Sequence, residues 1–262
     1  MSHAVWMSGG AKRPRGAKAK PPELEQLVLF EQKKRGGKRR GAGRPPKGER
    51  AGERHKQRPV HDPRHPVHVV LRAVKAVGNL RRARVYQAIR EATRTVARRE
   101  DVRIVHVSIQ RTHVHLLVEA NSKAALASGM QGFQISAAKH LNAAISKGRP
   151  GPRRRGTVFP DRYHAVVIAS PRQARHALSY VINNWRKHHE DRGEVTRRWD
   201  VDWYSSGAMF PDWKERGTEG FALRGPPELP PMVVGVPKTW LLREGWKKHG
   251  PISCREVPSA AR

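Results

Sequence analysis

Two apolar runs joined by only two residues, at positions 102–120, place the tightest constraint on the fold. The runs VRIVHVSIQ and HVHLLVEA alternate between apolar and polar residues, and Arg111 and Thr112 separate them. Alternation with a period of two is typical of a strand whose two faces meet different surroundings. Because so short a connection joins antiparallel neighbours, we expect a β-hairpin.

Patterns on both sides of this hairpin predict an α+β unit. Residues 67–74 are rich in β-branched residues and predict a strand, and residues 82–100 carry apolar residues at helical spacing. After the hairpin, Asn121 or Ser122 can cap a second helix. Residues 162–169 then predict a last strand.

A third helix is predicted from Ser170 to about Glu190. Ser170 suits the N-cap, Pro171 the first turn and Gln173 the capping box. The resulting order, β-α-β-β-α-β-α, is that of a ferredoxin-like antiparallel sheet with helices on one side and one additional terminal helix.

Positive charge dominates the composition. The chain has 53 Lys and Arg against 22 Asp and Glu, a formal net charge of +31. Such a field attracts polyanions, and neutralised phosphates supply much of the affinity of basic proteins for nucleic acid. We therefore expect a nucleic-acid partner rather than a merely solvated basic surface.

Other function classes are excluded by what the composition lacks. The single cysteine, Cys254, excludes a disulfide framework and any zinc module built from several cysteines. The sequence also lacks an apolar run of 18 residues and a signal-peptide core. We expect a soluble, cytoplasmic protein without a membrane partner.

Composition divides the chain into three parts. Residues 1–60 predict a flexible basic arm, residues 61–195 hold the α+β domain, and residues 196–262 form a tail rich in Trp and Pro. Within the arm, KRRGAGRPPKGER resembles an AT-hook, in which Arg44 would enter the narrow minor groove of A·T-rich DNA. A generic basic linker is the alternative.

The tail holds five of the seven tryptophans. We expect it to pack on the α+β domain, with contact to nucleic acid as the alternative. Because PPELPPMVVGVP suits an extended linker, we also expect the domain to fold without the residues from Pro226 onward.

His113 and His115 lie one residue apart on a predicted strand, so their rings project from the same face and Val114 from the other. Two neutral imidazoles this close can bind one divalent metal ion. The alternative is a pair of half-exposed surface histidines.

Tyr180 and Asn184 fall outside the apolar stripe of the last helix, one turn apart and on a common flank with Lys187. If this helix packs beside the histidine strand, both residues can face a metal ion. For Tyr180 alone, a place at the core boundary is the commoner use of tyrosine.

These residues carry a family resemblance. His113-Val114-His115 resembles the HUH signature of histidine, bulky apolar residue and histidine, and SYVINNWRKH resembles the tyrosine helix of single-tyrosine HUH transposases. Within that family the chain is most similar to the REP-associated tyrosine transposases, over roughly residues 66–192. GTVFPDRYHAVVI also resembles the stretch before the family's last strand. The Asn-Pro that often follows the tyrosine is replaced by Asn184-Trp185, from which we expect the helix to continue to about Glu190.

The resemblance implies a bacterial, nucleoid-associated enzyme that cleaves and rejoins single-stranded DNA at foldback hairpins. Tyr180 would form a 5′-phosphotyrosine, and His113, His115 and Asn184 would hold Mg²⁺ or Mn²⁺. The REP-associated group implies a monomer rather than a homodimer.

Substrate binding is expected from a basic groove with stacking rings. For the arginine run at 153–155, the alternative is a loop that is merely solvated. The candidate DNA-binding residues are Arg44, Arg153, Arg154, Arg155, Arg162, Tyr163 and Lys187.

Two other functions compete. A non-catalytic DNA-binding relative of the same fold would use the basic surfaces alone, but it would need neither the two histidines nor Tyr180 and Asn184. A replication-initiator or relaxase-like HUH nickase often has a second tyrosine nearby, which SYVINNW lacks.

Overall fold

The computed structural model describes residues 60–148, 150–223 and 225–258. All of them belong to the second of the two units into which the chain divides, residues 52–262. The predicted basic arm, with Arg44 and the AT-hook-like segment, lies outside the described residues.

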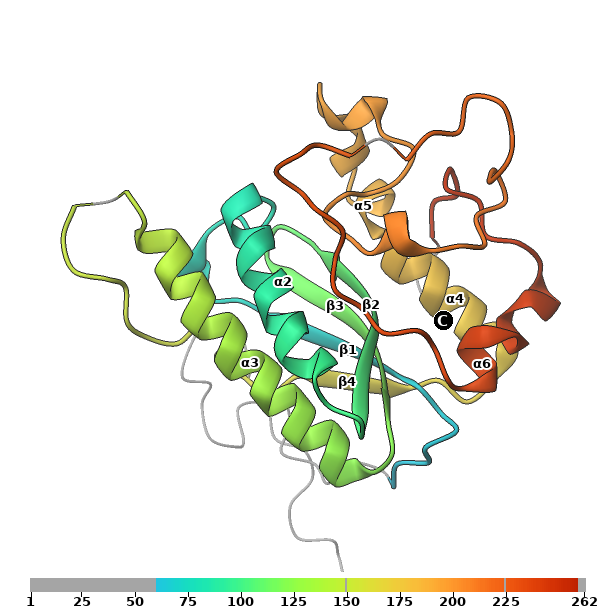
Figure 1. Ribbon diagram of the computed structural model, residues 1–262, viewed down its shortest axis with the longest axis horizontal. Helices are drawn as coiled ribbons and strands as arrows, with labels where there is room; N and C mark the ends of the chain where they lie inside the picture. Colours follow the sequence, from blue (N-terminus) through green and yellow to red (C-terminus); the bar gives the residue numbers. More distant parts are fainter. Residues whose placement is uncertain (1–59, 149, 224, 259–262) are drawn as a thin grey trace, which may run out of the picture. The chain divides into compact units, whose positions relative to one another are not determined.

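Four strands form one antiparallel sheet (Figure 1). Its spatial order is β2-β3-β1-β4, which is the ferredoxin-like order, so the predicted fold class is confirmed. The last strand is shorter than the expected residues 162–169. The strands are β1 (Val67–Arg72), β2 (Val102–Ile109), β3 (His113–Ala120) and β4 (His164–Val167).

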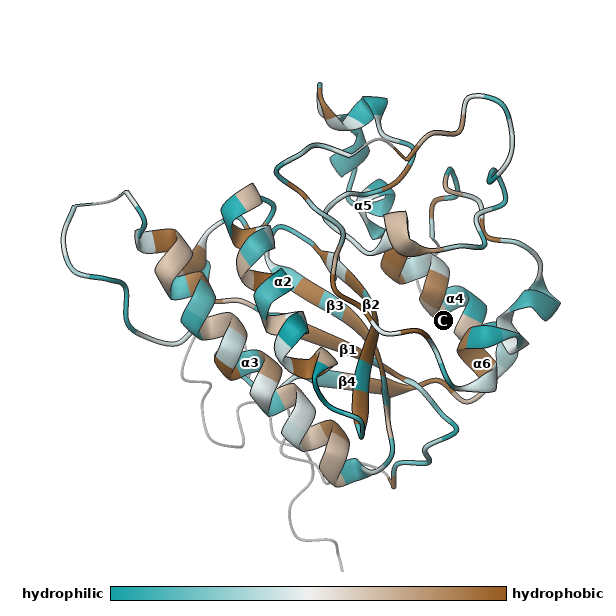
Figure 2. Ribbon diagram, in the orientation of Figure 1, coloured by the Kyte–Doolittle hydropathy of each residue, from teal (hydrophilic) through white to brown (hydrophobic). Residues whose placement is uncertain are grey.

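One face of the sheet is apolar and is covered by two helices, α2 (Ala83–Ala97) and α3 (Lys123–Ser146), which lie side by side (Figures 1 and 2). Strand β3 shows why, since Val114, Leu116 and Val118 alternate toward this face and are all buried. The Ser122 hydroxyl caps α3 by accepting a hydrogen bond from the Ala125 amide. None of the described helices has the length and apolar composition needed to cross a lipid bilayer.

The opposite face of the sheet packs against helix α4 (Pro171–Ile182), which contacts β2 and β3. The Ser170 hydroxyl caps this helix by accepting from the Gln173 amide, as expected. The sheet's β4 edge is more open, and Val166 is 47% exposed there.

The tyrosine helix is shorter than predicted. It ends at Ile182, because Asn183 leaves the helical conformation at φ −108° and ψ 9°, and a separate short turn, α5 (Asn184–Lys187), follows. The expected continuation to about Glu190 is therefore wrong. The Asn183 side chain donates to the Ser253 carbonyl at 2.9 Å, so a tail contact accompanies the end of the helix.

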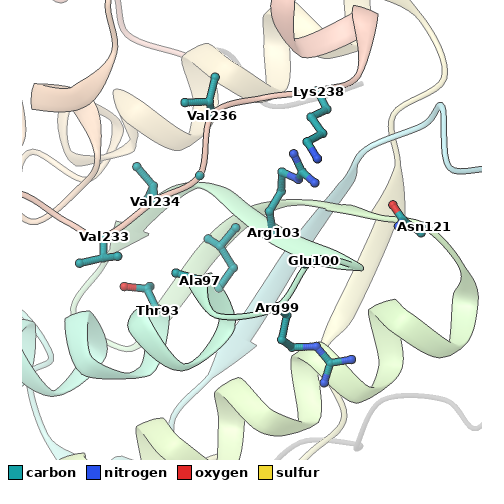
Figure 3. A pocket seen from close by; sticks show the side chains of 12 residues that line it. Thr93, Ala97, Arg99, Glu100, Arg103, Asn121, Val233, Val234, Val236 and Lys238 are labelled. Carbon is teal, nitrogen blue, oxygen red and sulfur yellow. The ribbon is translucent and has the colours of Figure 1, made fainter.

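The tail runs back along the domain. The Tyr86 hydroxyl donates a hydrogen bond of 2.6 Å to the Pro230 carbonyl in the extended segment of the tail. Further along this segment, the Gly235 amide donates to the Ile104 carbonyl of β2 at 2.8 Å. Beside β2 this segment closes one side of a cavity of about 650 Å³, where the side chains of Arg103 and Lys238 point toward one another (Figure 3).

Apolar residues of the tail complete the core. Leu229, Met232, Trp246 and Ile252 are buried in the same apolar cluster as the sheet and α4. The tail therefore packs on the domain, as expected. The expectation that the domain folds without the residues from Pro226 onward is not supported, because their removal would expose this shared core to water.

The end of the tail also clamps the tyrosine helix. Glu256 accepts two hydrogen bonds from the Arg175 guanidinium, at 2.8 and 2.7 Å, and a third from the Ser179 hydroxyl. Burial opposes ionisation of Glu256, but these hydrogen bonds outweigh it and lower the pKa of its carboxyl. Together with the hydrogen bond from Asn183 to Ser253, these contacts tie three successive turns, at Arg175, Ser179 and Asn183, to residues 251–256.

Replacing Glu256 by Gln is expected to lower the free energy of unfolding by about 1–2 kcal/mol at pH 7, because charge-assisted hydrogen bonds are lost. Since the folded pKa lies below the unfolded one, this contribution is present at neutral pH and is lost as the pH falls through the carboxylate range. Urea unfolding at several pH values measures it, with the exposed Glu244→Gln as control. An equal loss at acid and neutral pH would contradict the ion-pair explanation.

Candidate active site

His113 and His115 lie together on the face of the sheet that packs against α4. They occupy alternate positions of β3, and their ring centroids are 4.6 Å apart. Val114 between them is buried on the opposite face. The strand's alternation thus produces the predicted pairing of imidazoles.

Helix α4 brings Tyr180 to the same histidines. The centroid of its ring lies 5.3 Å from that of His115, in an edge-to-face contact. Lys187 also reaches this place, with Nζ 4.8 Å from the centroid of the Tyr180 ring. The His-x-His strand, Tyr180 and Lys187 are therefore brought together by one chain.

A third histidine, His68 of β1, joins the cluster and was not singled out from the sequence. Its Nε2 lies 3.0 Å from Nδ1 of His115, and its ring centroid is 5.8 Å from that of Tyr180. Alternation along VHVVLR does place His68 on one face with Val70 and Arg72. Only the pairing register, with Val70 opposite His115, shows which face that is.

Two of the side chains that the sequence singles out have buried polar atoms without a hydrogen-bond partner. His115 is 3% exposed, and its Nε2 has no partner. Asn184, one turn beyond Tyr180, is fully buried, and neither its amide oxygen nor its amide nitrogen has one. Buried polar atoms without a partner are costly, and water or a bound ion can satisfy them.

Burial keeps the site histidines neutral. It lowers the pKa of His113 to about 4, with the nearby charges of His188 and Arg72 adding to the effect. Burial is also the main reason why the pKa of His115 lies well below its usual value, and the charge of His68 lowers this pKa further. Neutral imidazoles are the form that binds a metal ion. Within residues 60–258, as far as they are described, no three His, Cys, Asp or Glu side chains form a metal-binding group.

Tyr180 is also affected by burial, which raises the pKa of its phenol. Its hydroxyl is therefore protonated at neutral pH. A reaction at this oxygen requires positive charge close to the phenol or to its target.

The arginine run lies away from this cluster. The loop after α3 extends from the end of that helix away from α4 (Figure 1). Arg153 donates to the Lys139 carbonyl, and Arg154 donates to Asn142 and Thr157, so both hold the loop onto α3 or close it on itself. Arg155 is exposed in the same loop.

Arg162 and Tyr163 line a different groove, between α3 and the β4 edge, with a volume of about 850 Å³. Tyr163 is only 7% exposed and belongs to the core, which is a poor position for the expected base-stacking ring. Among the predicted DNA-binding residues that the structure describes, Lys187 alone contacts Tyr180.

Residues 63–184 match the family model of IS200-like transposases. The chain contains an IS200-like transposase domain. The predicted family is thereby confirmed, and the matched range of this IS200-like domain includes the histidine strand, Tyr180 and Asn184.

A solved structure of a REP-associated tyrosine transposase bound to a REP hairpin is 16% identical, covering 52% of this chain and 74% of that chain with a TM-score of 0.40. A similarity this low does not establish a shared fold, and the hairpin is a ligand of that protein. A search of the curated proteins finds no match to the chain.

The buried His106 should make the stability of the IS200-like domain depend on pH. His106 is buried on β2 beside the Ser206 hydroxyl, and burial lowers its pKa to about 4. The unfolded chain therefore binds a proton between about pH 6.5 and 4 that the folded chain does not. The stabilisation that comes from neutral His106 is therefore fully present above about pH 6.5, and it is lost as the pH falls toward 4.

Between pH 7 and pH 5, wild-type protein is expected to lose about 2 kcal/mol more unfolding free energy than His106→Gln, which keeps a partner for Ser206. Urea unfolding at each pH measures this difference. The exposed His140→Gln should follow the wild-type profile. Parallel profiles for wild type and His106→Gln would show that His106 is not held neutral in the folded protein.

Proposed function

We propose that this chain is a metal-dependent transposase or nickase that cleaves and rejoins single-stranded DNA through Tyr180. The observation that carries the proposal is the contact of Tyr180 with the His-x-His pair, at a centroid distance of 5.3 Å from His115. A nucleophile beside two neutral imidazoles is an arrangement suited to metal-assisted attack on a phosphodiester.

In the proposed step the phenolic oxygen of Tyr180 attacks a backbone phosphorus, and the bond from that phosphorus to the 3′ oxygen breaks. The products are a 5′-phosphotyrosine and a free 3′-hydroxyl, which takes up the proton that the phenol has lost to solvent. Because one phosphate ester replaces another, the 3′-hydroxyl of a second strand can reverse the step without ATP.

Positive charge has to compensate for the raised pKa of Tyr180. Lys187 is placed for this, with Nζ 4.8 Å from the ring centroid, and we propose that it stabilises negative charge on the phenol oxygen and the phosphate.

The buried polar atoms of the site fit a divalent ion. We propose that His113, His115 and Asn184 hold Mg²⁺ or Mn²⁺, because Nε2 of His115 and the amide oxygen of Asn184 are buried without partners. Such an ion would act as a Lewis acid on the scissile phosphate.

The proposed substrate is single-stranded DNA, with hairpin repeats as the expected target. Its support is the net charge of +31 and the open β4 edge beside the histidine face. Arg155 and Arg162 remain proposed contacts to the DNA backbone away from the cleavage site. The resemblance of the sequence to the REP-associated group leads us to propose a monomer.

Replacing Tyr180 by Phe should abolish covalent attachment to DNA. Wild-type protein incubated with labelled single-stranded oligonucleotides from the repeats flanking its gene, with Mn²⁺, should give an adduct on a denaturing protein gel. EDTA should remove the adduct.

The matched control is Tyr204→Phe, which removes another partly buried tyrosine hydroxyl and should leave the adduct unchanged. Retarded DNA without any adduct, equal in wild type and Tyr180→Phe across many flanking sequences, would favour the non-catalytic DNA-binding alternative.

Removing a proposed ligand should weaken metal binding. We expect Mn²⁺ affinity, measured from the electron paramagnetic resonance signal of free Mn²⁺, to fall at least about 10-fold in His115→Ala and in Asn184→Ala. The exposed His189→Ala is the control. Unchanged affinity in Asn184→Ala alone would remove Asn184 from the ligand set and leave the histidines.

A further inference from the structure

His68 contacts the proposed metal ligand His115 through a specific pair of atoms. Nε2 of His68 lies 3.0 Å from Nδ1 of His115, a hydrogen-bond distance. The two ring planes are 25° apart and their centroids are separated by 5.2 Å, so the rings meet through their nitrogen edges rather than face to face.

This contact allows two arrangements of one proton. In the first, Nδ1–H of His115 donates to Nε2 of His68, and Nε2 of His115 carries a lone pair. In the second, Nε2–H of His68 donates to Nδ1 of His115, and Nε2 of His115 carries a hydrogen.

Burial distinguishes the two arrangements. Nε2 of His115 is buried and has no hydrogen-bond partner. In the second arrangement it would be a buried N–H without an acceptor, which is costly. In the first it carries a lone pair, on a ring that contacts the rings of His113 and Tyr180, and a cation can use this lone pair.

We propose that His68 is a positioning residue that accepts a hydrogen bond from Nδ1–H of His115 and so holds Nε2 of His115 ready to bind the metal ion. This inference rests on the proposed function. Partners of this kind fix the tautomer and the ring orientation of histidine ligands, and their loss typically costs 10- to 100-fold in metal affinity.

His68 itself is not in a position to be a ligand through Nε2, because that atom is taken by the contact with His115. The role proposed for Nε2 of His68 is therefore to orient His115. The contact with the Tyr180 ring, at 5.8 Å between centroids, further holds His68 between the two functional side chains.

The tautomer can be read directly, without metal, from two-bond ¹⁵N–¹H correlation spectra of the metal-free full-length protein. The His115 signals are assigned from their loss in His115→Gln. We expect the Nδ1–H form in wild type and in His68→Gln, whose amide oxygen also accepts, and a shift toward Nε2–H in His68→Leu. An Nε2–H form in wild type would overturn the inference.

Mn²⁺ titration gives the second reading. We expect His68→Leu to bind Mn²⁺ about 10- to 100-fold more weakly than wild type and His68→Gln to stay within about 3-fold of it. Thermal unfolding of each variant identifies any that fails to fold. Wild-type affinity in a folded His68→Leu, with affinity lost in His115→Ala, would overturn the inference and leave the proposed metal site intact.

The two proposals fail in different ways. If wild-type protein binds no Mn²⁺, the proposed metal-dependent function fails, and the role of His68 in preparing a ligand fails with it, whichever tautomer the spectra show. If wild type binds Mn²⁺ and both His68 variants are weakened equally, packing of the ring rather than its acceptor nitrogen is responsible, and the inference is wrong.

Discussion

The structure depends on the alternation of side chains along β3, which is paired on both edges. Its even-numbered residues are apolar and buried under α2 and α3, whereas His113 and His115 face α4. A slip of one residue in the pairing would exchange these faces and bury the imidazoles in the apolar core. The free energy that holds the fold together therefore also fixes the direction in which the histidines point.

Helix α4 supplies the other half of the site, and the tail determines where it lies. Two kinds of contact act together here. Trp246 and Ile252 pack in the same apolar core as the buried side of α4. Glu256 holds Arg175 and Ser179 of this helix by ionic hydrogen bonds. Apolar packing is not directional, whereas hydrogen bonds to two successive turns fix both the rotation and the axial position of a helix. Tyr180 is placed by a segment that is distant from it in sequence.

Local patterns predicted much of this architecture from the sequence. The hairpin, the cap at Ser170 and the common face of His113 and His115 follow from periodicity and short-range capping rules. The approach of Tyr180 to these histidines depended on α4 packing beside their strand, which local patterns do not determine. The end of α4 at Ile182 was not predicted either, because Asn183 binds Ser253, a partner 70 residues away. His68 was missed for a similar reason, since only the β1–β3 register brings it to His115. Tyr163 was expected in the wall of a DNA-binding groove, but its ring is buried just before β4, because a tyrosine in a basic stretch does not reveal whether its ring turns into the core.

The clamp on the tyrosine helix has a consequence for biosynthesis. The ribosome makes the helix that carries Tyr180 well before it makes Ser253 and Glu256, and domains begin to fold from their N-terminal parts during synthesis. Tyr180 is therefore held in register beside the histidines only after the last tail contacts exist. Such long-range contacts close slowly, because a large loop must be ordered before they contribute. An emerging chain therefore lacks the complete candidate site until the end of its tail has been made.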